Sequence, residues 1–249
     1  MSSKLFKTKG IVLRTVKYGE TSLIVTVYTE LFGLQSYLVN GVRTATGRNR
    51  GKANLFHPAA LLDLVVYHHD GGSLNRIREF QWGHLYEHIF QQVTKNAVAL
   101  FIVELLAHCL KQPEENQPLF QFTEDCLLQL DQASPAVTAN LSLFFALQLT
   151  HFFGVSPRIA NAEEGPLYFD LVDSVITHNP PLHQNYLEGK MASNCVELLR
   201  TRQLEELEEI KMNQKMRRQL LQQLETYFVY HIQDFRPLKS LPVLSAMLQ

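Results

Sequence analysis

Four cations lie close together in a segment that has no large apolar residue until Leu55. The segment is Gly41–Phe56, GVRTATGRNRGKANLF, and its cations are Arg43, Arg48, Arg50 and Lys52. No acidic residue occurs between Glu30 and Asp63. Lysine and arginine spaced by glycine and asparagine can follow a phosphate backbone and release its counterions, and arginine can also stack on bases. The segment therefore predicts a binding site for a polyanion, with a solvated surface loop as the alternative.

The charge of the chain is unevenly distributed. The net charge of the 249 residues is -1, but residues 1–80 hold 11 Lys+Arg against 5 Asp+Glu, and the remainder holds 12 against 19. This asymmetry favours a polyanionic partner for the first part of the chain. Charges that alternate with apolar residues on a strand should point outward. The candidate polyanion-binding residues outside the loop are Lys9, Arg14, Lys17, Arg76 and Arg78.

Three tyrosines, Tyr28, Tyr37 and Tyr67, lie in segments with strand character and could stack on nucleic-acid bases. Alternation sends half of the side chains of a strand inward, and the interior of a small barrel is filled by side chains. Core packing is therefore the alternative for each of them.

Two sequence motifs of known enzymes are incomplete or absent in this chain. Gly51-Lys52 resembles part of a phosphate-binding loop, but that motif needs a glycine and a Ser or Thr where this sequence has Thr46 and Ala53. No G-x-S-x-G nucleophile motif occurs. We therefore expect a protein that is not an enzyme.

Metal binding has one weak candidate. His84, Glu87 and His88 would share one face of a helix, and two histidines four residues apart can bind zinc. The pattern is not HExxH and no third ligand is indicated, so a solvated face is the alternative. The cysteines have apolar neighbours and no CxxC spacing, which indicates core residues: Cys109, Cys126 and Cys195. We expect neither a metal nor a cofactor.

The chain carries no sign of a membrane segment. No apolar run long enough for a signal peptide follows the lysines of residues 1–10, and the stretch AVALFIVELLAHCL is interrupted by Glu104 and is shorter than the ~20 residues that span a bilayer. We expect a cytoplasmic protein.

Residues 1–80 have the pattern of a small barrel. Five short segments rich in β-branched and aromatic residues are separated by turn signals, and the basic loop follows the third of them. The predicted strands are GIVLRTVKY, TSLIVTVYT, GLQSYLVNGV, PAALLDLVVYH and SLNRIREF. This number of strands in about 80 residues suits an OB-fold, and an SH3-like barrel is the alternative.

Residues 81–249 have the pattern of a helical domain. Apolar residues at helical spacing predict a long helix over 84–111, a second over 120–132, and a third from Ser134-Pro135 to Phe153. Residues 154–184 lose this period and contain four prolines, which predicts an irregular excursion with a possible hairpin in LYFDL and SVITH. Helices resume at Asn194, which with Glu197 forms a candidate capping pair, and a last helix covers 213–232. The fold class is therefore α+β, with an amino-terminal barrel packed on an all-helical domain.

Five short groups of residues follow one another along the predicted barrel: Tyr18-Gly19-Glu20-Thr21-Ser22, Tyr28-Thr29, Gly33, Gly41-Val42-Arg43 and Leu55-Phe56-His57-Pro58. With the order of the predicted elements, this set resembles the bacterial RecO family of DNA repair and recombination mediators. The terminal HIQDFRPLKSLPVL is similar to the last segment of the family. Many relatives have a four-cysteine zinc module where this chain has residues 154–184, which contain no cysteine. A zinc module is therefore not expected here.

The resemblance implies a function that needs no catalytic residue. It implies an OB barrel on a helical domain that binds single- and double-stranded DNA, anneals complementary strands and, with RecR, helps RecA replace single-strand-binding protein on DNA. In this picture the basic residues named above contact phosphates, and the helical domain offers a groove to the acidic tail of single-strand-binding protein. Candidates for that groove, chosen by charge alone, are Arg200, Arg202, Lys215, Arg217 and Arg218. A scaffolding protein and an RNA-binding barrel are the alternatives.

Overall fold

The computed structural model describes residues 4–44, 51–68, 74–160 and 165–247. The chain forms two compact units. The first contains Met1–Glu87 and Leu110–Leu128, and the second contains His88–Cys109 and Gln129–Gln249. The first unit thus includes a segment, Leu110–Leu128, that the sequence-based division at residue 80 assigns to the helical domain. Among the described residues, no helix combines the length and the apolar character that crossing a bilayer requires.

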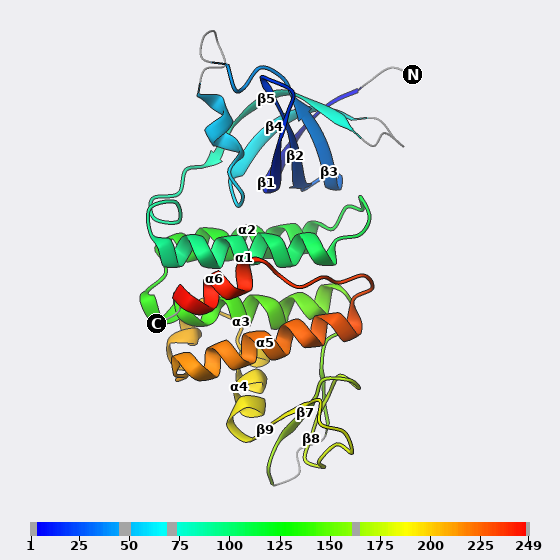
Figure 1. Ribbon diagram of the computed structural model, residues 1–249, viewed down its shortest axis with the longest axis vertical. Helices are drawn as coiled ribbons and strands as arrows, with labels where there is room; N and C mark the ends of the chain where they lie inside the picture. The colour runs from blue at the N-terminus through cyan, green and yellow to red at the C-terminus, as the bar shows by residue number, and fades with distance from the viewer. Residues whose placement is uncertain (1–3, 45–50, 69–73, 161–164, 248–249) are drawn as a thin grey trace. The chain divides into compact units, whose positions relative to one another are not determined.

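The first unit is built on a closed five-stranded barrel (Figure 1). Its strands are β1 Lys4–Tyr18, β2 Ser22–Thr29, β3 Gly33–Val39, β4 Leu61–His68 and β5 Asn75–His84. They pair in the order β1-β2-β3-β5-β4, and β1 also pairs with β4. The long β1 closes the barrel because its first half pairs with β4 and its second half with β2, with an irregularity between Val12 and Arg14. The predicted five-stranded, OB-like barrel is confirmed.

Alternation along the strands fills the barrel. On β2, Leu23, Val25 and Val27 are buried, whereas the intervening Ile24 and Thr26 are partly exposed. A segment from residues 110–128 packs on this barrel. The hydroxyl of Tyr28 donates to the Asn116 carbonyl oxygen at 3.0 Å, and the ammonium of Lys9 pairs with the Glu124 carboxylate at 2.8 Å.

The second unit is a helical bundle with a small sheet (Figure 1). Its main helices are α1 Val93–Cys109, α3 Pro135–Phe152, α4 Gly189–Arg200, α5 Gln214–His231 and α6 Ser240–Met247, with a short 3-10 helix, η2, at Leu204–Glu208. The helix α2 Gln117–Gln132 begins in the first unit and ends in the second. Within the second unit, α3 contacts α1, α4, α5 and η2. Its interior position agrees with a sequence that is apolar on every side.

The predicted third helix is confirmed together with its start. The Ser134 hydroxyl accepts a hydrogen bond from the Val137 amide, and Pro135 occupies the first helical position. The helix predicted over 84–111 is shorter than expected and begins at Val93. His84 still belongs to β5, and the backbone amides of His88 and Ile89 donate to the carboxylate of Asp131, each at 2.8 Å. This tertiary contact holds His88 and Ile89 in a turn, although the sequence around them has the spacing of a helix.

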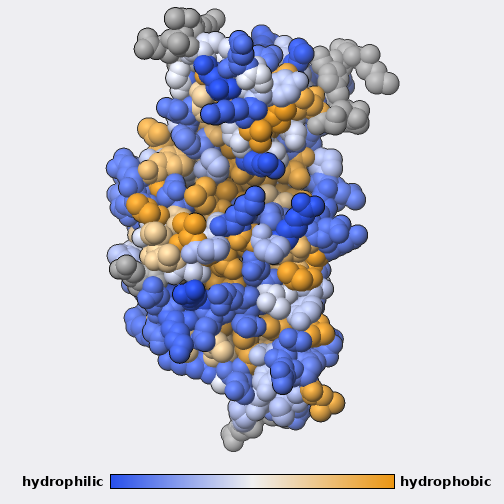
Figure 2. All heavy atoms as spheres, in the orientation of Figure 1, coloured by the Kyte–Doolittle hydropathy of each residue, from blue (hydrophilic) through white to orange (hydrophobic). Residues whose placement is uncertain are grey.

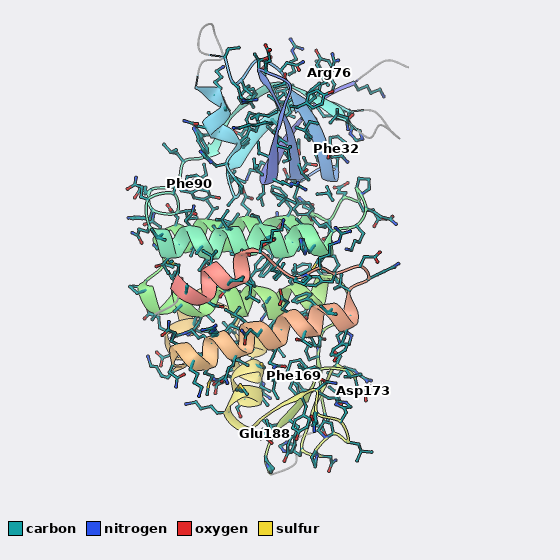
Figure 3. The ribbon with its side chains drawn as sticks, viewed as in Figure 1. Phe32, Arg76, Phe90, Phe169, Asp173 and Glu188 are labelled. Atoms are coloured by element: carbon teal, nitrogen blue, oxygen red, sulfur yellow. The ribbon has the colours of Figure 1, made fainter. Side chains whose placement is uncertain are left out.

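The expectation of an all-helical domain needs correction. Residues 158–188 form a four-stranded sheet in the order β6-β8-β7-β9, with β6 Arg158–Ile159, β7 Tyr168–Asp170, β8 Val175–Thr177 and β9 Tyr186–Glu188. The predicted hairpin is present as the antiparallel pair β7–β8. Figure 3 labels Phe169, Asp173 and Glu188 on this part of the chain. Buried Phe169, Ile176 and Leu187 give the sheet an apolar face.

The predicted capping pair Asn194–Glu197 is also wrong. The helix α4 begins at Gly189, five residues earlier, so Asn194 lies inside it. Asn194 is buried, and its amide nitrogen lies 3.1 Å from the Met216 sulfur. Because the preceding β9 leads directly into α4, the sheet sets where this helix begins.

Candidate nucleic-acid interface

The strand register assigns the side chains of the barrel to an outer and an inner surface. Ile24 faces outward, and its register partners are Val16 on β1 and Leu38 on β3. Leu38 is in turn paired with Arg76 on β5. Partners in register point to the same side of a sheet. One outward row therefore crosses four strands, from exposed Val16 to exposed Arg76.

Two further rows flank this one. Arg14 pairs with Thr26, which pairs with Ser36. Tyr18 pairs with Ser22, whose hydroxyl lies 3.2 Å from the Asn40 side-chain oxygen. We call these three rows on β1, β2 and β3 the outer face. Figure 2 shows hydrophobic side chains exposed on the barrel, at the top of the view, next to strongly hydrophilic ones.

A groove separates the end of β3 from β5. The two strands pair only at Tyr37–Asn75 and Leu38–Arg76. Beyond these pairs lies a cavity of about 450 Å³, which we call the β3–β5 groove. Its lining includes Asn40 from the outer face, and its cations are Lys52, Arg76 and Arg78. Arg76 is labelled among the side chains of the barrel in Figure 3. The tertiary structure thus brings together three of the nine cations that the sequence suggested.

Among the residues that the structure describes, one of the three groove cations, Arg78, has a carboxylate partner, and Lys52 lies over an aromatic ring. The Lys52 ammonium lies 5.6 Å from the centroid of the Phe80 ring, and that ring packs on Phe56 at a centroid distance of 4.7 Å. Arg78 pairs with Glu79 at 3.4 Å, but both side chains are about half exposed or more, at 49% and 65%. An exposed pair of this kind contributes little and can rearrange around a phosphate. The described lining of the groove therefore has three cations and one carboxylate, that of Glu79.

Lys9 occupies a different environment. Its hydrogen bond to Glu124 raises the pKa of its ammonium, and burial opposes this less strongly. The cavity that Lys9 lines, about 730 Å³ in volume, also contains Glu30, Asp63 and Glu79. A phosphate there would meet three carboxylates, so Lys9 serves the structure by joining β1 to α2.

The other barrel candidates are dispersed. Arg14 is exposed on the outer face. Lys17 pairs with buried Leu23, so it points to the inner side and emerges at the end of the barrel. The guanidinium of Arg43 donates to the Gly19 carbonyl oxygen at 3.1 Å, which ties the segment after β3 to the β1–β2 turn. Arg48 and Arg50 lie outside the described residues.

Two of the three tyrosines that were candidates for base stacking lie in the core, which was the alternative for each of them. Tyr28 and Tyr37 are fully buried, and burial raises the pKa of both phenols, so neither can stack on a base. Tyr67 is partly exposed. The exposed aromatic residue of the outer face is Tyr18, which is 53% accessible and which sequence reasoning missed. The position of Tyr18 directly before the turn at Gly19 could have indicated from the sequence that its side chain is exposed.

The helical unit uses one of its candidate arginines internally. Arg217 donates to the side-chain oxygen of Asn140 at 2.9 Å, and the amide of Asn140 donates to the carbonyl oxygens of Leu207 and Ile210. Desolvation lowers the pKa of Arg217. The remaining four candidates are exposed on the surface: Arg200, Arg202, Lys215 and Arg218.

A cavity of about 650 Å³ lies elsewhere in the helical unit, and we call it the helical pocket. Its walls include apolar Pro135 and Met247 and the buried Lys95. The ammonium of Lys95 donates to the Asp131 carbonyl oxygen at 2.7 Å, and desolvation lowers its pKa against the opposing effect of Asp131. None of the five charge-based candidates is among the described residues that line this pocket.

The histidine candidates for a metal do not share a helical face. His84 lies on β5 and His88 lies in the turn before α1. Within residues 4–44, 51–68, 74–160 and 165–247, no group of three His, Cys, Asp or Glu side chains is arranged to hold a metal ion.

An OB-like barrel with a cationic groove, together with a helical bundle, is an arrangement that occurs among nucleic-acid-binding proteins. Two family models match the chain, "Recombination protein O N terminal" over residues 1–86 and "Recombination protein O C terminal" over residues 91–163. The chain is 34% identical to DNA repair protein RecO of Bacteroides fragilis over 98% of its own length and 99% of that protein. It is 32% identical to DNA repair protein RecO of Christiangramia forsetii over 97% of its own length and 98% of that protein. The chain belongs to the RecO family of DNA repair and recombination proteins.

Proposed function

We propose that this protein is a non-enzymatic, DNA-binding recombination mediator that acts in DNA repair. The observation that carries the proposal is the assembly of Lys52, Arg76 and Arg78 in the β3–β5 groove, next to the outer face of the barrel. Such a groove binds phosphates without reading sequence, so single- and double-stranded DNA both bind, and affinity falls with salt. Its place of action would be the bacterial cytoplasm, at the nucleoid.

Strand annealing follows from this mode of binding. A strand whose phosphates are neutralised in the groove repels a second strand less, and its bases remain available for pairing. With RecR as a partner, the same protein would help RecA replace single-strand-binding protein on DNA. Membership of the RecO family supports this role.

The helical pocket is our candidate site for the tail of single-strand-binding protein. An acidic peptide with an apolar end needs apolar surface and a cation. Pro135 and Met247 supply apolar surface, and the cation of the pocket is the ammonium of Lys95, which also donates to the Asp131 carbonyl oxygen. Lys95→Met is expected to weaken the binding of a tail peptide while DNA binding by the barrel stays unchanged. A peptide that binds the variant as well as the native chain would move the site elsewhere, with the exposed arginines on α4 and after it as the next candidates.

The decisive experiment is a titration of labelled single-stranded DNA with the full chain, read by fluorescence anisotropy over a range of salt concentrations. The test variant is Lys52→Glu/Arg76→Glu/Arg78→Glu. Each phosphate contact to a single strand contributes about −0.7 to the slope of log K against log salt, so loss of three contacts should flatten the slope by about 2. The variant should also fail to anneal complementary strands.

A matched variant controls for net charge. Arg200→Glu/Lys215→Glu/Arg218→Glu makes the same change in total charge on exposed residues of the helical unit and should leave the salt slope unchanged. Equal losses in both variants would show that the groove is not the site. Failure of the native chain to bind DNA at low salt would favour a scaffolding protein, and a preference for RNA of the same sequence would favour an RNA-binding barrel.

A further inference from the structure

The outer face carries one strongly exposed aromatic ring, that of Tyr18. The register of β1 with β2 points this side chain outward, opposite Ser22. Tyr28 and Tyr37 lie in the core, whereas Phe56 and Phe80 pack against each other. Within the part of the chain that the structure describes, the Tyr18 ring takes part in no aromatic contact, and about half of the residue, 53%, is accessible to a ligand.

Tyr18 lies close to the cationic groove. Ser22 is its direct register partner, and the Ser22 hydroxyl lies 3.2 Å from Asn40, which lines the β3–β5 groove. Neighbouring strands are about 4.8 Å apart, so the Tyr18 backbone lies roughly 10 Å from that wall of the groove, measured across two strand spacings. A short piece of extended single-stranded DNA bridges this distance.

The row that leads from Tyr18 to the groove is polar, but the row beside it is apolar. Val16, Ile24 and Leu38 form the adjoining row, which ends at Arg76, and Val16 is 42% exposed. Arg14 lies on the opposite side of this row. An apolar row that has Arg76 at one end, Arg14 on one side and the Tyr18 ring on the other matches a ligand whose apolar faces are joined by phosphates. Unpaired bases have exposed faces, whereas a duplex hides the faces of its bases in the stack.

We infer that Tyr18 stacks on an unpaired base of a DNA strand whose phosphates lie in the β3–β5 groove, and that this contact gives the protein a preference for single strands over duplexes. The inference rests on the proposed function. A single ring anchors one base and leaves the following bases free. This arrangement is compatible with annealing, which a continuous stacking platform would obstruct.

The test compares the affinities of the full chain for a labelled single strand and for a duplex of the same sequence. Alanine substitution of a stacking aromatic residue weakens binding by about 5- to 150-fold per base. Tyr18→Ala should weaken single-strand binding within this range and leave duplex binding and the salt slope unchanged. Tyr18→Phe should retain the native affinity, because the ring and not the hydroxyl makes the contact.

A second tyrosine provides the control for a loss of exposed aromatic surface. Tyr230 on α5 is 46% exposed, and Tyr230→Ala should change neither affinity. A strand carrying the fluorescent base 2-aminopurine should be quenched by the native chain and by Tyr18→Phe, but not by Tyr18→Ala. Thermal unfolding of each variant verifies that the fold is retained.

The inference fails if Tyr18→Ala weakens single-strand and duplex binding equally, or changes neither. When the groove variant loses binding in the same assay, such a result leaves the proposed function intact. A native chain that binds neither DNA would overturn the proposed function as well, so the two failures are distinguishable.

Discussion

Replacement of Gly33 by alanine should destabilise the barrel far more than an ordinary glycine substitution does. Gly33 begins β3 with a φ of +59°. A side chain in this left-handed conformation costs about 1–2 kcal/mol. In addition, a Cβ atom at this position would lie 2.0 Å from the carbonyl oxygen of Glu114 and 2.6 Å from its carbonyl carbon. Ordinary carbon–carbon contacts lie at about 3.5–4.0 Å, so the backbone around Glu114 must move.

The cost of this movement follows from what the same segment holds. Asn116, two residues after Glu114, accepts the hydrogen bond of the buried Tyr28 hydroxyl. Loss of that bond leaves a buried donor without a partner, at a cost of about 1–3 kcal/mol. Together with the backbone strain, Gly33→Ala should lower the free energy of unfolding by about 2–5 kcal/mol.

Gly19 provides the matched control. Its φ is +56°, but no atom lies within 4 Å of the position that its Cβ would take. Gly19→Ala should therefore cost only the backbone strain of about 1–2 kcal/mol. Asparagine tolerates the left-handed conformation better than alanine does, so Gly19→Asn should be milder still, whereas Gly33→Asn should remain severe because it keeps the Cβ clash.

Urea unfolding monitored by tryptophan fluorescence measures these differences. Trp82 is the single tryptophan of the chain and lies on β5, so its signal reports on the barrel. Equal losses of stability for Gly33→Ala and Gly19→Ala would refute the reasoning, because they would mean that the contact with Glu114 carries no energy.

Three other contacts lead to further expectations. Lys9→Met should cost about 1–3 kcal/mol, because it leaves Glu124, whose side chain is 11% exposed, without its cation; Lys9→Met/Glu124→Leu should recover part of this loss in urea unfolding. Asn140→Ala removes three hydrogen bonds and should cost about 2–4 kcal/mol; a loss below that range in a denaturant titration would show that water replaces them. At Glu104, burial alone would raise the pKa, but hydrogen bonds from Ser240 and Lys239 and the nearby His108 outweigh it, so the pKa is lowered. A lowered pKa gives stability that is present above the ordinary Glu value and is lost as the pH falls through the folded-state value. Glu104→Gln should therefore reduce the acid-induced drop in unfolding midpoint, and an unchanged pH profile would contradict this assignment.

The sequence predicted the elements that are determined by residues close together in the chain. Alternating β-branched residues identified all five barrel strands, and the Ser134-Pro135 pair identified the start of α3. The residue pattern around Tyr18-Gly19-Glu20 also led to the family that the comparisons establish. These signals succeed because period, capping and turn chemistry act between residues that are close in the chain.

Errors arose where a distant residue competed with the local pattern. Residues 84–92 have helical spacing, but β5 and the carboxylate of Asp131 hold them in other conformations. Asn194 resembles a helix cap, but β9 leads into α4 at Gly189. In the first place the decisive contact joins His88 to the distant Asp131, and in the second the pairing of β9 with β7, Leu187 with Phe169, fixes the strand from which α4 begins. A local pattern does not contain either contact.

The sequence by itself determined that this chain has a basic barrel and a helical domain, because composition, strand alternation and helical period are properties of short segments. Only the tertiary structure decided which cations lie together. Barrel closure brings Lys52 next to Arg76 and Arg78, places Lys9 among carboxylates, buries Tyr28 and leaves Tyr18 exposed. Alternation tells which side chains share a face, but the register and closure of the strands determine which faces meet.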